Sequence, residues 1–428
     1  MNRKRIIKEF IENQDKKTKV LDYPFKVIYK KVDNPISFVA FFTKVGSIYE
    51  KDDYKGIAHL IEHCIFRGSQ KYSQDISKMI NSLGGYTNAY TSYDQTAYYI
   101  NLPSSSLFQA MDILWDMVFN PLFRKEDVES ERNIIFHEIK MRDDDPFVVL
   151  FEETLKSMYS VNPIRHPIIG YEETLKNIDL EIISEFYSYY RNPENSFFVI
   201  VTDYDEKDIR KKLDDLFKAC KIDNKRIEVD FTEENVKYDK LELKGSVSKT
   251  YLMISYKAPK LSEKYKDIEK SYYFSLISYI LAGSSYGLFN RILKNEKKLV
   301  DAVSFDMYST NELPGIIYFA AVCEYKNINK IIDEYKKIIS GLKSLIEFDF
   351  FDVVKENFYS SAFWSFETSS NQGMLIGSNE LFKTYKEAYN YLYKIENIKL
   401  NDVLDLFYDY VRTDDFMISI YDKESPPS

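Results

Sequence analysis

The sequence predicts an α+β protein of two similar halves, each an antiparallel sheet covered by helices on one face. Two observations support this fold class. Both halves of the 428-residue chain run through the same order of predicted elements: strand, helix, glycine break, strand pair, then helices. Between the halves lies a polar, highly charged stretch. We therefore expect a first domain over residues 1–220, a charged linker over 221–245, and a second domain of similar topology over 246–428.

In the first half, the strand candidates are rich in β-branched and aromatic residues. They are residues 25–31, 36–43, a strand pair within 86–102, and 197–201. The helix candidates carry apolar residues at helical spacing. They are residues 58–66, 74–83, 107–119, 126–142, 151–159 and 180–190. Gly84 and Gly85 end the second helix, and an aspartate cluster before Pro146 ends the fourth, because proline does not fit a helix interior.

The second half repeats this order. Its strand candidates are residues 250–255, 302–307 and 315–323, and its first helix candidate is 271–281, which a Gly-Ser-Ser break at Gly283 follows. Helical segments dominate toward the C-terminus. No repeat is visible in the letters themselves, so the likeness of the halves is one of element order.

Composition excludes several classes of protein. The net charge is −9, so we expect no nucleic-acid partner, because phosphate binding requires a basic face. Cys64, Cys220 and Cys323 are too few and too far apart for a disulfide framework. Residues 1–18 lack the apolar stretch of a signal peptide, and no apolar run reaches the roughly 20 residues that span a bilayer. We therefore expect a cytoplasmic protein with no membrane partner.

The segment of residues 56–68 holds the most informative motif, His-x-x-Glu-His, at His59, Glu62 and His63. At about 100° per residue, these three side chains share one third of a helix circumference. Two imidazoles at positions i and i+4 can each present a nitrogen to one metal ion, about 2.0–2.1 Å away. The Glu62 carboxylate lies beside them, where a general base would act. This spacing is the inverted zincin pattern.

The alternative is a structural pair of histidines. Histidines on one helical face are more often solvated or core residues than metal ligands, and short motifs also occur by chance. Here, however, the chain has only four histidines, and two of them fall in this motif. The residues between them are apolar, so the helix is expected to be largely buried, and buried polar groups need partners. A metal ion would be that partner, which favours a metal site.

A third metal ligand should come from another element, because a catalytic zinc site uses three protein ligands and leaves one position open. Residues 126–142 offer Glu131 and Glu138, whose separation of seven residues places both acids on one helix face. One of them could bind the metal while the other orients a ligand from behind. Spacing alone leaves open which is which. His137 points elsewhere on this helix, and we interpret it as structural.

Further motifs surround this core in a fixed order. They are Val45-Gly46-Ser47, His59-x-x-Glu62-His63, Phe66-Arg67-Gly68-Ser69, Leu83-Gly84-Gly85, Asn88-Ala89-Tyr90-Thr91, Glu131-Arg132 followed by Glu138, and Asp144-Asp145-Pro146. With these motifs the chain resembles the pitrilysin and insulysin family of inverted-zincin metallopeptidases. It is most similar to the short bacterial members related to mitochondrial processing peptidase subunits. The resemblance covers most of the first half.

The resemblance implies a zinc hydrolase in which Glu138 is the third zinc ligand, Glu131 the acid behind the ligands, and Glu62 the general base. It also implies that the two halves form half of a clam-shell around a peptide. The substrate would pair with an edge strand, by β-augmentation, at Asn88, Ala89, Tyr90 and Thr91. An ordinary sheet strand is the alternative for that segment, and both can hold.

The second half departs from the family. Members that act alone carry an Arg and a Tyr seven residues apart, which donate hydrogen bonds near the scissile carbonyl. Lys294 and Asp301 stand at the matching positions here, and an ionised aspartate cannot donate a hydrogen bond. Some bacterial relatives divide these duties between two chains. The resemblance therefore implies a heterodimer with a homologous partner that supplies the missing pair.

The function predicted is zinc-dependent endopeptidase activity, in a processing or leader peptidase that acts on peptides within an enclosed chamber. Two alternatives remain open. One is a non-catalytic architectural subunit, like the core proteins of respiratory complexes, which typically have degraded metal motifs. The other is a self-sufficient homodimer that degrades peptides generally.

Overall fold

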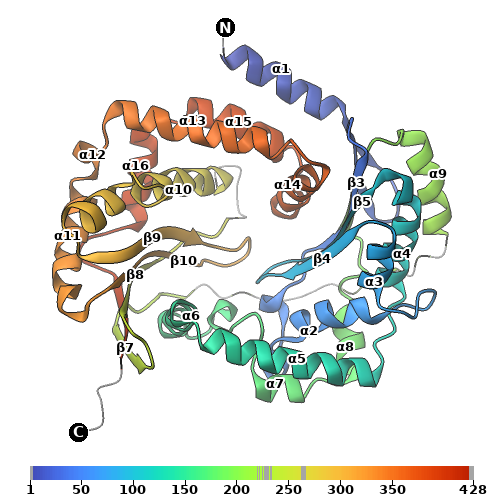
Figure 1. Ribbon diagram of the computed structural model, residues 1–428, viewed down its shortest axis with the longest axis horizontal. Coiled ribbons are helices and arrows are strands. Elements are labelled where there is room, and N and C mark those ends of the chain that lie inside the picture. Colours follow the sequence, from blue (N-terminus) through green and yellow to red (C-terminus); the bar gives the residue numbers. More distant parts are fainter. Residues whose placement is uncertain are drawn as a thin grey trace. The chain divides into compact units, whose positions relative to one another are not determined.

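The computed structural model describes residues 3–218, 220, 222–223, 225, 231, 234–261 and 267–423. The chain folds into two compact units, and neither is continuous in sequence. The first unit comprises Met1–Ile139, Pro167–Asp230 and Ser361–Tyr393. The second comprises Lys140–His166, Phe231–Ser360 and Lys394–Ser428. Figure 1 shows their helices and strands, with labels where there is room.

The first unit holds a six-stranded sheet and most of the helices of the N-terminal half. Its strands are β1 (Thr18–Leu21), β2 (Lys26–Lys31), β3 (Ile36–Thr43), β4 (Tyr86–Thr91), β5 (Thr96–Pro103) and β6 (Ser196–Thr202). Its helices are α1 (Arg3–Lys16), α2 (Ile57–Cys64), α3 (Ile76–Ser82), α4 (Leu107–Phe119), most of α5 (Lys125–Asp143), α7 (Glu172–Lys176), α8 (Leu180–Tyr187), α9 (Glu206–Phe217), α14 (Ser369–Phe382) and most of α15 (Glu387–Asn397).

The strands of the first sheet run in the order β1-β2-β6-β3-β5-β4. All neighbours are antiparallel except β2 and β6, which are parallel. Successive residues of β3 face opposite sides, as a strand requires. Val39 and Phe41 join the core cluster that contains residues of α2 and α4, whereas Phe38 and Phe42 join a second cluster with α14. The central strands are therefore buried on both faces, and β4 is a free edge.

Helix α14 approaches the sheet closely because two of its residues are glycines. It contacts β3 and β6. A Cβ atom at Gly373 would lie 2.1 Å from the ring of Phe38, and one at Gly377 would lie 2.1 Å from the ring of Phe42. Any larger side chain at either glycine would push the helix away from the aromatic rings.

The second unit holds a five-stranded sheet in the order β7-β11-β8-β10-β9. Its strands are β7 (Lys240–Gly245), β8 (Thr250–Lys257), β9 (Val300–Tyr308), β10 (Ile316–Cys323) and β11 (Met417–Lys423). Its helices are α6 (Pro146–Met158), α10 (Asp267–Leu281), α11 (Ile328–Ser340), α12 (Leu342–Leu345), most of α13 (Phe348–Trp364) and α16 (Leu400–Tyr410). Among the neighbouring strands of this sheet, β7 and β11 are parallel and the other pairs are antiparallel. Helix α6 packs on β8 and β11, where the Thr154 hydroxyl donates to Ser419 Oγ over 2.7 Å.

The predicted α+β class, with two helix-covered sheets, is confirmed. Two details of the sheets differ from the expectation. Each sheet contains one parallel pair, and α14 covers the face of the first sheet opposite to α2 and α4. The expected domains, 1–220 and 246–428, follow the chain, whereas the compact units do not: α6 belongs to the second unit and α14 to the first. Part of the expected linker, 221–245, lies outside the described residues, and its last six residues form β7.

None of the helices in the described part of the chain combines the length and the apolar character needed to cross a bilayer.

Candidate metal centre

Helix α2 carries three of the predicted site residues, and its start is fixed by an unusual cap. Gly56, which precedes the helix, has a φ of 96°, a left-handed conformation that favours glycine. The buried carboxylate of Glu50 accepts the main-chain N–H of Gly56 over 2.8 Å and that of Ala58 over 2.9 Å. Burial raises the pKa of Glu50 to about 8, although both N–H donors favour the ionised form. Glu50 thus caps the helix from the loop before it.

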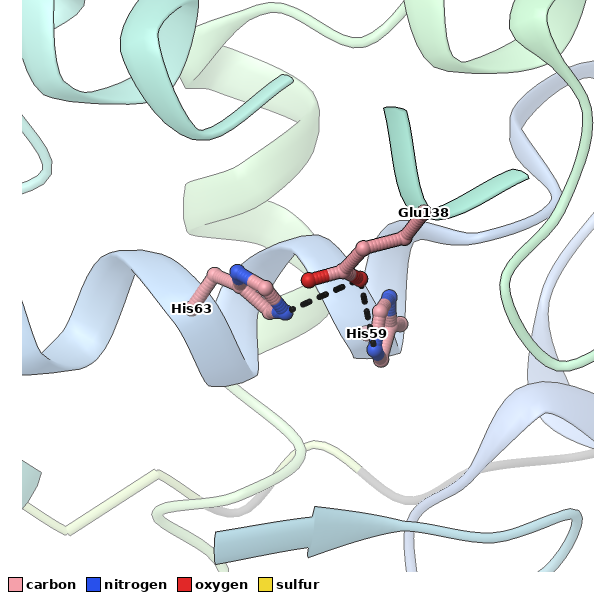
Figure 2. A group of neighbouring side chains, drawn as sticks. All are labelled: His59, His63 and Glu138. Atoms are coloured by element: carbon pink, nitrogen blue, oxygen red, sulfur yellow. Dashed lines mark ion pairs between the residues drawn. The ribbon is translucent and has the colours of Figure 1, made fainter. Parts of the chain in front are cut away.

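Helix α2 buries its apolar face and turns its polar residues the other way. The buried residues are Ile57, Ala58, Leu60, Ile61 and Cys64. The remaining face presents His59, Glu62 and His63, as the predicted spacing requires. Helix α5 contributes Glu138, whose carboxylate faces the two imidazoles (Figure 2).

The side chains of His59, His63 and Glu138 converge on one point (Figure 2). Oε2 of Glu138 lies 3.6 Å from Nε2 of His63 and 4.0 Å from Nε2 of His59. One ligand atom from each residue lies within 4.8 Å of the other two. In a tetrahedral zinc site with bonds of about 2.0–2.2 Å, ligand atoms are about 3.3–3.6 Å apart. The group therefore fits a zinc ion with only small side-chain movements.

The electrostatics of the group suit a divalent cation. Burial lowers the pKa of His59 to about 3, so this imidazole is neutral at pH 7, the form that binds metals. For His63, burial acts in the same direction, but the hydrogen bond to Glu131 and the charges of Glu138 and Glu62 outweigh it and raise the pKa. The side chains of His59, His63 and Glu138 are 18%, 19% and 38% exposed, so an exchangeable ligand can reach the site from solvent.

Glu131 lies behind His63 and faces its other ring nitrogen. Oε2 of Glu131 is 3.0 Å from Nδ1 of His63, and the Arg67 guanidinium pairs with Oε1. Burial alone would raise the pKa of Glu131, but the hydrogen bonds from His63 and Arg67 lower it. An ionised Glu131 accepts the Nδ1 proton of His63 and so leaves the Nε2 lone pair directed toward Glu138. The two acids of α5, which spacing alone could not tell apart, thus face different nitrogens.

Glu62 is tied to the sheet by the side chain of Thr91. The Thr91 hydroxyl, at the end of β4, donates to Oε2 of Glu62 over 2.5 Å. Burial raises the pKa of the Glu62 carboxyl, and the Thr91 hydrogen bond and the charge of His63 offset part of that increase. A base with a raised pKa that remains close to the metal group is suited to accept a proton at neutral pH.

The segment predicted to bind substrate forms most of β4, the edge strand of the first sheet. Asn88 is exposed, and Ala89, Tyr90 and Thr91 are partly buried. On its inner side β4 pairs with β5, and its other side pairs with no strand of the described residues. The free side offers main-chain groups to an added strand.

The remaining predicted positions lie elsewhere. His137 is exposed on α5. Lys294 is exposed within a π-helix, Asn290–Glu296, of the second unit. Asp301 lies near the start of β9, where its carboxylate is 3.2 Å from Nζ of Lys249 and 58% exposed.

Sequence reasoning missed three contacts of this site: the Glu50 cap, the Arg67 partner of Glu131, and the hydrogen bond from Thr91 to Glu62. Arg67 and Thr91 belong to motifs that the sequence singled out, but the motifs gave no partner for either side chain. Glu50 gave no signal, because rules for helix caps look at the residue directly before the helix, and that residue is Gly56.

Comparison with known proteins agrees with this fold. The family model described as insulinase (peptidase family M16) matches residues 26–172, which include His59, His63 and Glu138. A second model, described as the peptidase M16 inactive domain, matches residues 177–356. The chain belongs to the insulinase family of peptidases.

Curated relatives resemble the chain along most of its length, and solved structures share its fold. An uncharacterised zinc protease of Rickettsia felis is 25% identical over 85% of this chain and 87% of its own length. One from Bacillus subtilis is 24% identical over 83% and 86%. A protease from Helicobacter pylori shares the fold with a TM-score of 0.85 at 19% identity, covering 95% of this chain and 98% of that one. The peptidase M16 inactive domain from Pseudomonas fluorescens gives 0.81 at 14% identity, covering 96% and 98%.

Proposed function

We propose that this protein is a zinc-dependent endopeptidase subunit, with zinc held by His59, His63 and Glu138. The observation that carries the proposal is the convergence of both Nε2 atoms on one carboxylate oxygen, 3.6 and 4.0 Å away. This set of two imidazoles and one carboxylate is typical of catalytic zinc sites, which leave a fourth position open. The relatives named zinc proteases support the choice of metal.

In this proposal each side chain of the centre has a separate task. Zinc bound there would lower the pKa of a water molecule to about 7 and polarise the scissile carbonyl. Glu62 is the general base: its carboxylate takes a proton from the attacking water and passes it to the leaving amine. Glu131 keeps the His63 ring in the tautomer that leaves Nε2 free. Arg67 keeps Glu131 ionised.

The proposed substrate is an extended peptide that adds to the free edge of β4 at Asn88, Ala89, Tyr90 and Thr91. Main-chain hydrogen bonds along such an edge bind many sequences, so they give affinity with little selectivity. A processing or leader peptidase role would need further contacts to choose its cleavage site.

The proposed subunit works with a homologous partner. Neither Lys294 nor Asp301 reproduces the Arg and Tyr donors of family members that act alone, and Asp301 lies beside Lys249. A partner chain would supply those donors to the carbonyl in the transition state. The alternatives are a self-sufficient homodimer and an architectural subunit without activity.

The substitution Glu62→Gln tests the proposed function. It preserves the shape of the side chain but removes the base, so zinc should remain at one ion per chain while peptide hydrolysis falls by about 10²- to 10⁴-fold. Zinc is measured by mass spectrometry and hydrolysis with internally quenched peptides, in the presence of the partner if the wild type needs it. Full activity in the Glu62→Gln variant would refute the assignment.

A further inference from the structure

Thr91 stands out among the four residues of the proposed docking strand, because its side chain contacts another member of the site. Its hydroxyl donates to Oε2 of Glu62 over 2.5 Å. That length is typical of a hydroxyl bound to an ionised carboxylate, among the stronger hydrogen bonds in proteins. By contrast, the side chain of Asn88 accepts the N–H of its neighbour Ala89 over 2.9 Å.

The strand around Thr91 is rigid enough to hold a side chain in place. Thr91 is the last residue of β4 and pairs with Thr96 of β5. The Thr96 hydroxyl is buried and donates to the main-chain oxygen of Val45 over 2.8 Å. A β-branched residue also has a restricted χ1 angle in a strand, so the Thr91 hydroxyl has little freedom to turn away.

The Glu62 carboxylate, in contrast, ends a long side chain with several rotatable bonds. The Thr91 hydrogen bond engages Oε2, so a second oxygen is left to accept a proton. A general base needs such an orienting group, because the transferred proton must travel along a short, well-aligned path.

We propose that Thr91 is a positioning residue: its hydroxyl fixes the Glu62 carboxylate in the orientation that proton transfer requires. This inference rests on the proposed function and deepens it. Because Thr91 also belongs to the strand on which the peptide would pair, substrate binding and alignment of the base share one residue. Peptide bound at the edge would hold β4, and with it Thr91 and Glu62, in the productive arrangement.

The test compares Thr91→Val, which keeps the shape and loses the hydroxyl, with Thr91→Ser, which keeps the hydroxyl. Thr87→Val is the matched control, since Thr87 lies on the same strand but its hydroxyl donates to the main-chain oxygen of Tyr99, 3.0 Å away. For each variant we would measure zinc per chain, kcat and KM with internally quenched peptides, with the partner subunit present if the wild type requires it.

We expect Thr91→Val to retain one zinc ion per chain and a KM within about threefold of the wild type, while kcat falls by about 10- to 100-fold. Thr91→Ser should recover kcat to within about threefold, and Thr87→Val should stay within about twofold of the wild type.

Four outcomes would overturn the inference. A KM increase with unchanged kcat would make Thr91 a substrate contact only. Loss of zinc, or a kcat deficit that serine fails to rescue, would make its role structural. Equal kcat in Thr91→Val and the wild type would show that the hydrogen bond has no catalytic effect. These results leave the proposed function intact, whereas a wild type without zinc or activity would overturn both.

Discussion

The two imidazoles of the site differ in what surrounds them, although the sequence presents them as a symmetric pair. His63 is held by Glu131 at Nδ1, whereas Nδ1 of His59 is buried without a hydrogen-bond partner among the described residues. Burial holds the pKa of His59 at about 3, and acidic neighbours raise that of His63. His63 is therefore the ligand whose orientation is set by hydrogen bonding, and His59 the ligand set by packing on α2.

A second residue of unusual electrostatics lies away from the metal group. Lys30 of β2 is fully buried, and its Nζ donates to Oε1 of Gln14 over 2.7 Å and to the Tyr389 hydroxyl over 3.2 Å. Its ammonium also lies 4.9 Å from the centre of the Tyr389 ring. Within the described residues no carboxylate pairs with it. Burial lowers the pKa of Lys30 to about 7, with a smaller contribution from the charge of Lys17.

This lowered pKa predicts a pH-dependent stability. In the unfolded chain Lys30 keeps its proton up to about pH 10.5, whereas in the folded chain it loses the proton near pH 7. The unfolded state therefore binds more protons between these values, and the free energy of unfolding rises with pH across that window. From pH 7 to 9 the free energy of unfolding of the wild type should rise by about 2 kcal/mol more than that of Lys30→Met.

Urea unfolding of both chains at pH 7, 8 and 9 measures that difference. The control is Lys8→Met, because it makes the same substitution at a lysine whose side chain is 74% exposed. Parallel stability profiles for the wild type and Lys30→Met would contradict the prediction.

At the scale of the element, the short helix α2 depends on groups outside it. It has eight residues, which is too short to be stable alone in water. Glu50 caps its first turn. Just before the helix, the main-chain oxygen of Lys55 accepts a hydrogen bond from the Thr174 hydroxyl over 2.7 Å. A Cβ atom at Gly170 would lie 2.2 Å from that same oxygen. The segment before the helix is thus packed between the Glu50 loop and the start of α7.

Loss of the cap should therefore destabilise the fold. Glu50→Ala would leave the N–H groups of Gly56 and Ala58 buried without acceptors, and we expect the free energy of unfolding to fall by about 2–4 kcal/mol. Glu50→Gln keeps one oxygen acceptor and should cost about half as much. Urea unfolding measures both variants, with the exposed Glu129→Ala as the control. An unchanged stability in Glu50→Ala would show that the cap is dispensable.

Elements with strong local patterns could be predicted from the sequence, and those defined by distant partners could not. Residues 36–43 and 107–119 form β3 and α4 with the predicted bounds, because one is a run of β-branched and aromatic residues and the other has a continuous apolar face. The charged strand β7 falls within the predicted linker, because that stretch is polar and highly charged: four of the six residues of β7 are charged or glycine. It exists because β11, far along the chain, pairs with it.

The same limit applies to the site. Helical spacing alone predicted that His59, Glu62 and His63 share a face, because this relation is local. Which of Glu131 and Glu138 faces Nε2 depends on how α5 lies against α2, a tertiary relation that spacing does not contain. The hydrogen bond from Thr91 to Glu62 joins a strand and a helix 29 residues apart and is equally invisible to a local pattern.

At the scale of the whole molecule, each compact unit contains a helix from the other half of the sequence. Residues 361–393 complete the first unit, and 140–166 belong to the second. Element order along the chain could not predict that these two segments belong to the opposite units. Their placement depends on which sheet each helix packs against. Truncation near residue 220 would therefore remove α14 from the first sheet and expose the apolar side chains of Phe38 and Phe42.

The proposed partner is also a question at this scale. If donors at the positions of Lys294 and Asp301 are missing, the lone chain should hydrolyse peptides poorly, and a homologous subunit that carries the Arg and Tyr pair should raise the rate by about 10²-fold or more. Light scattering of the two proteins, separate and mixed, should then detect a heterodimer. Full peptidase activity from the lone chain, as a monomer or homodimer, would remove the reason for a partner.

The most direct test of the central claim is a crystal structure of the zinc-soaked protein with anomalous data collected on both sides of the zinc absorption edge. The proposal predicts one anomalous peak per chain, about 2.0–2.2 Å from Nε2 of His59, Nε2 of His63 and a carboxylate oxygen of Glu138. It also predicts that Glu131 stays on Nδ1 of His63. A peak that bypasses any of these three side chains, or no peak at saturating zinc, would contradict it.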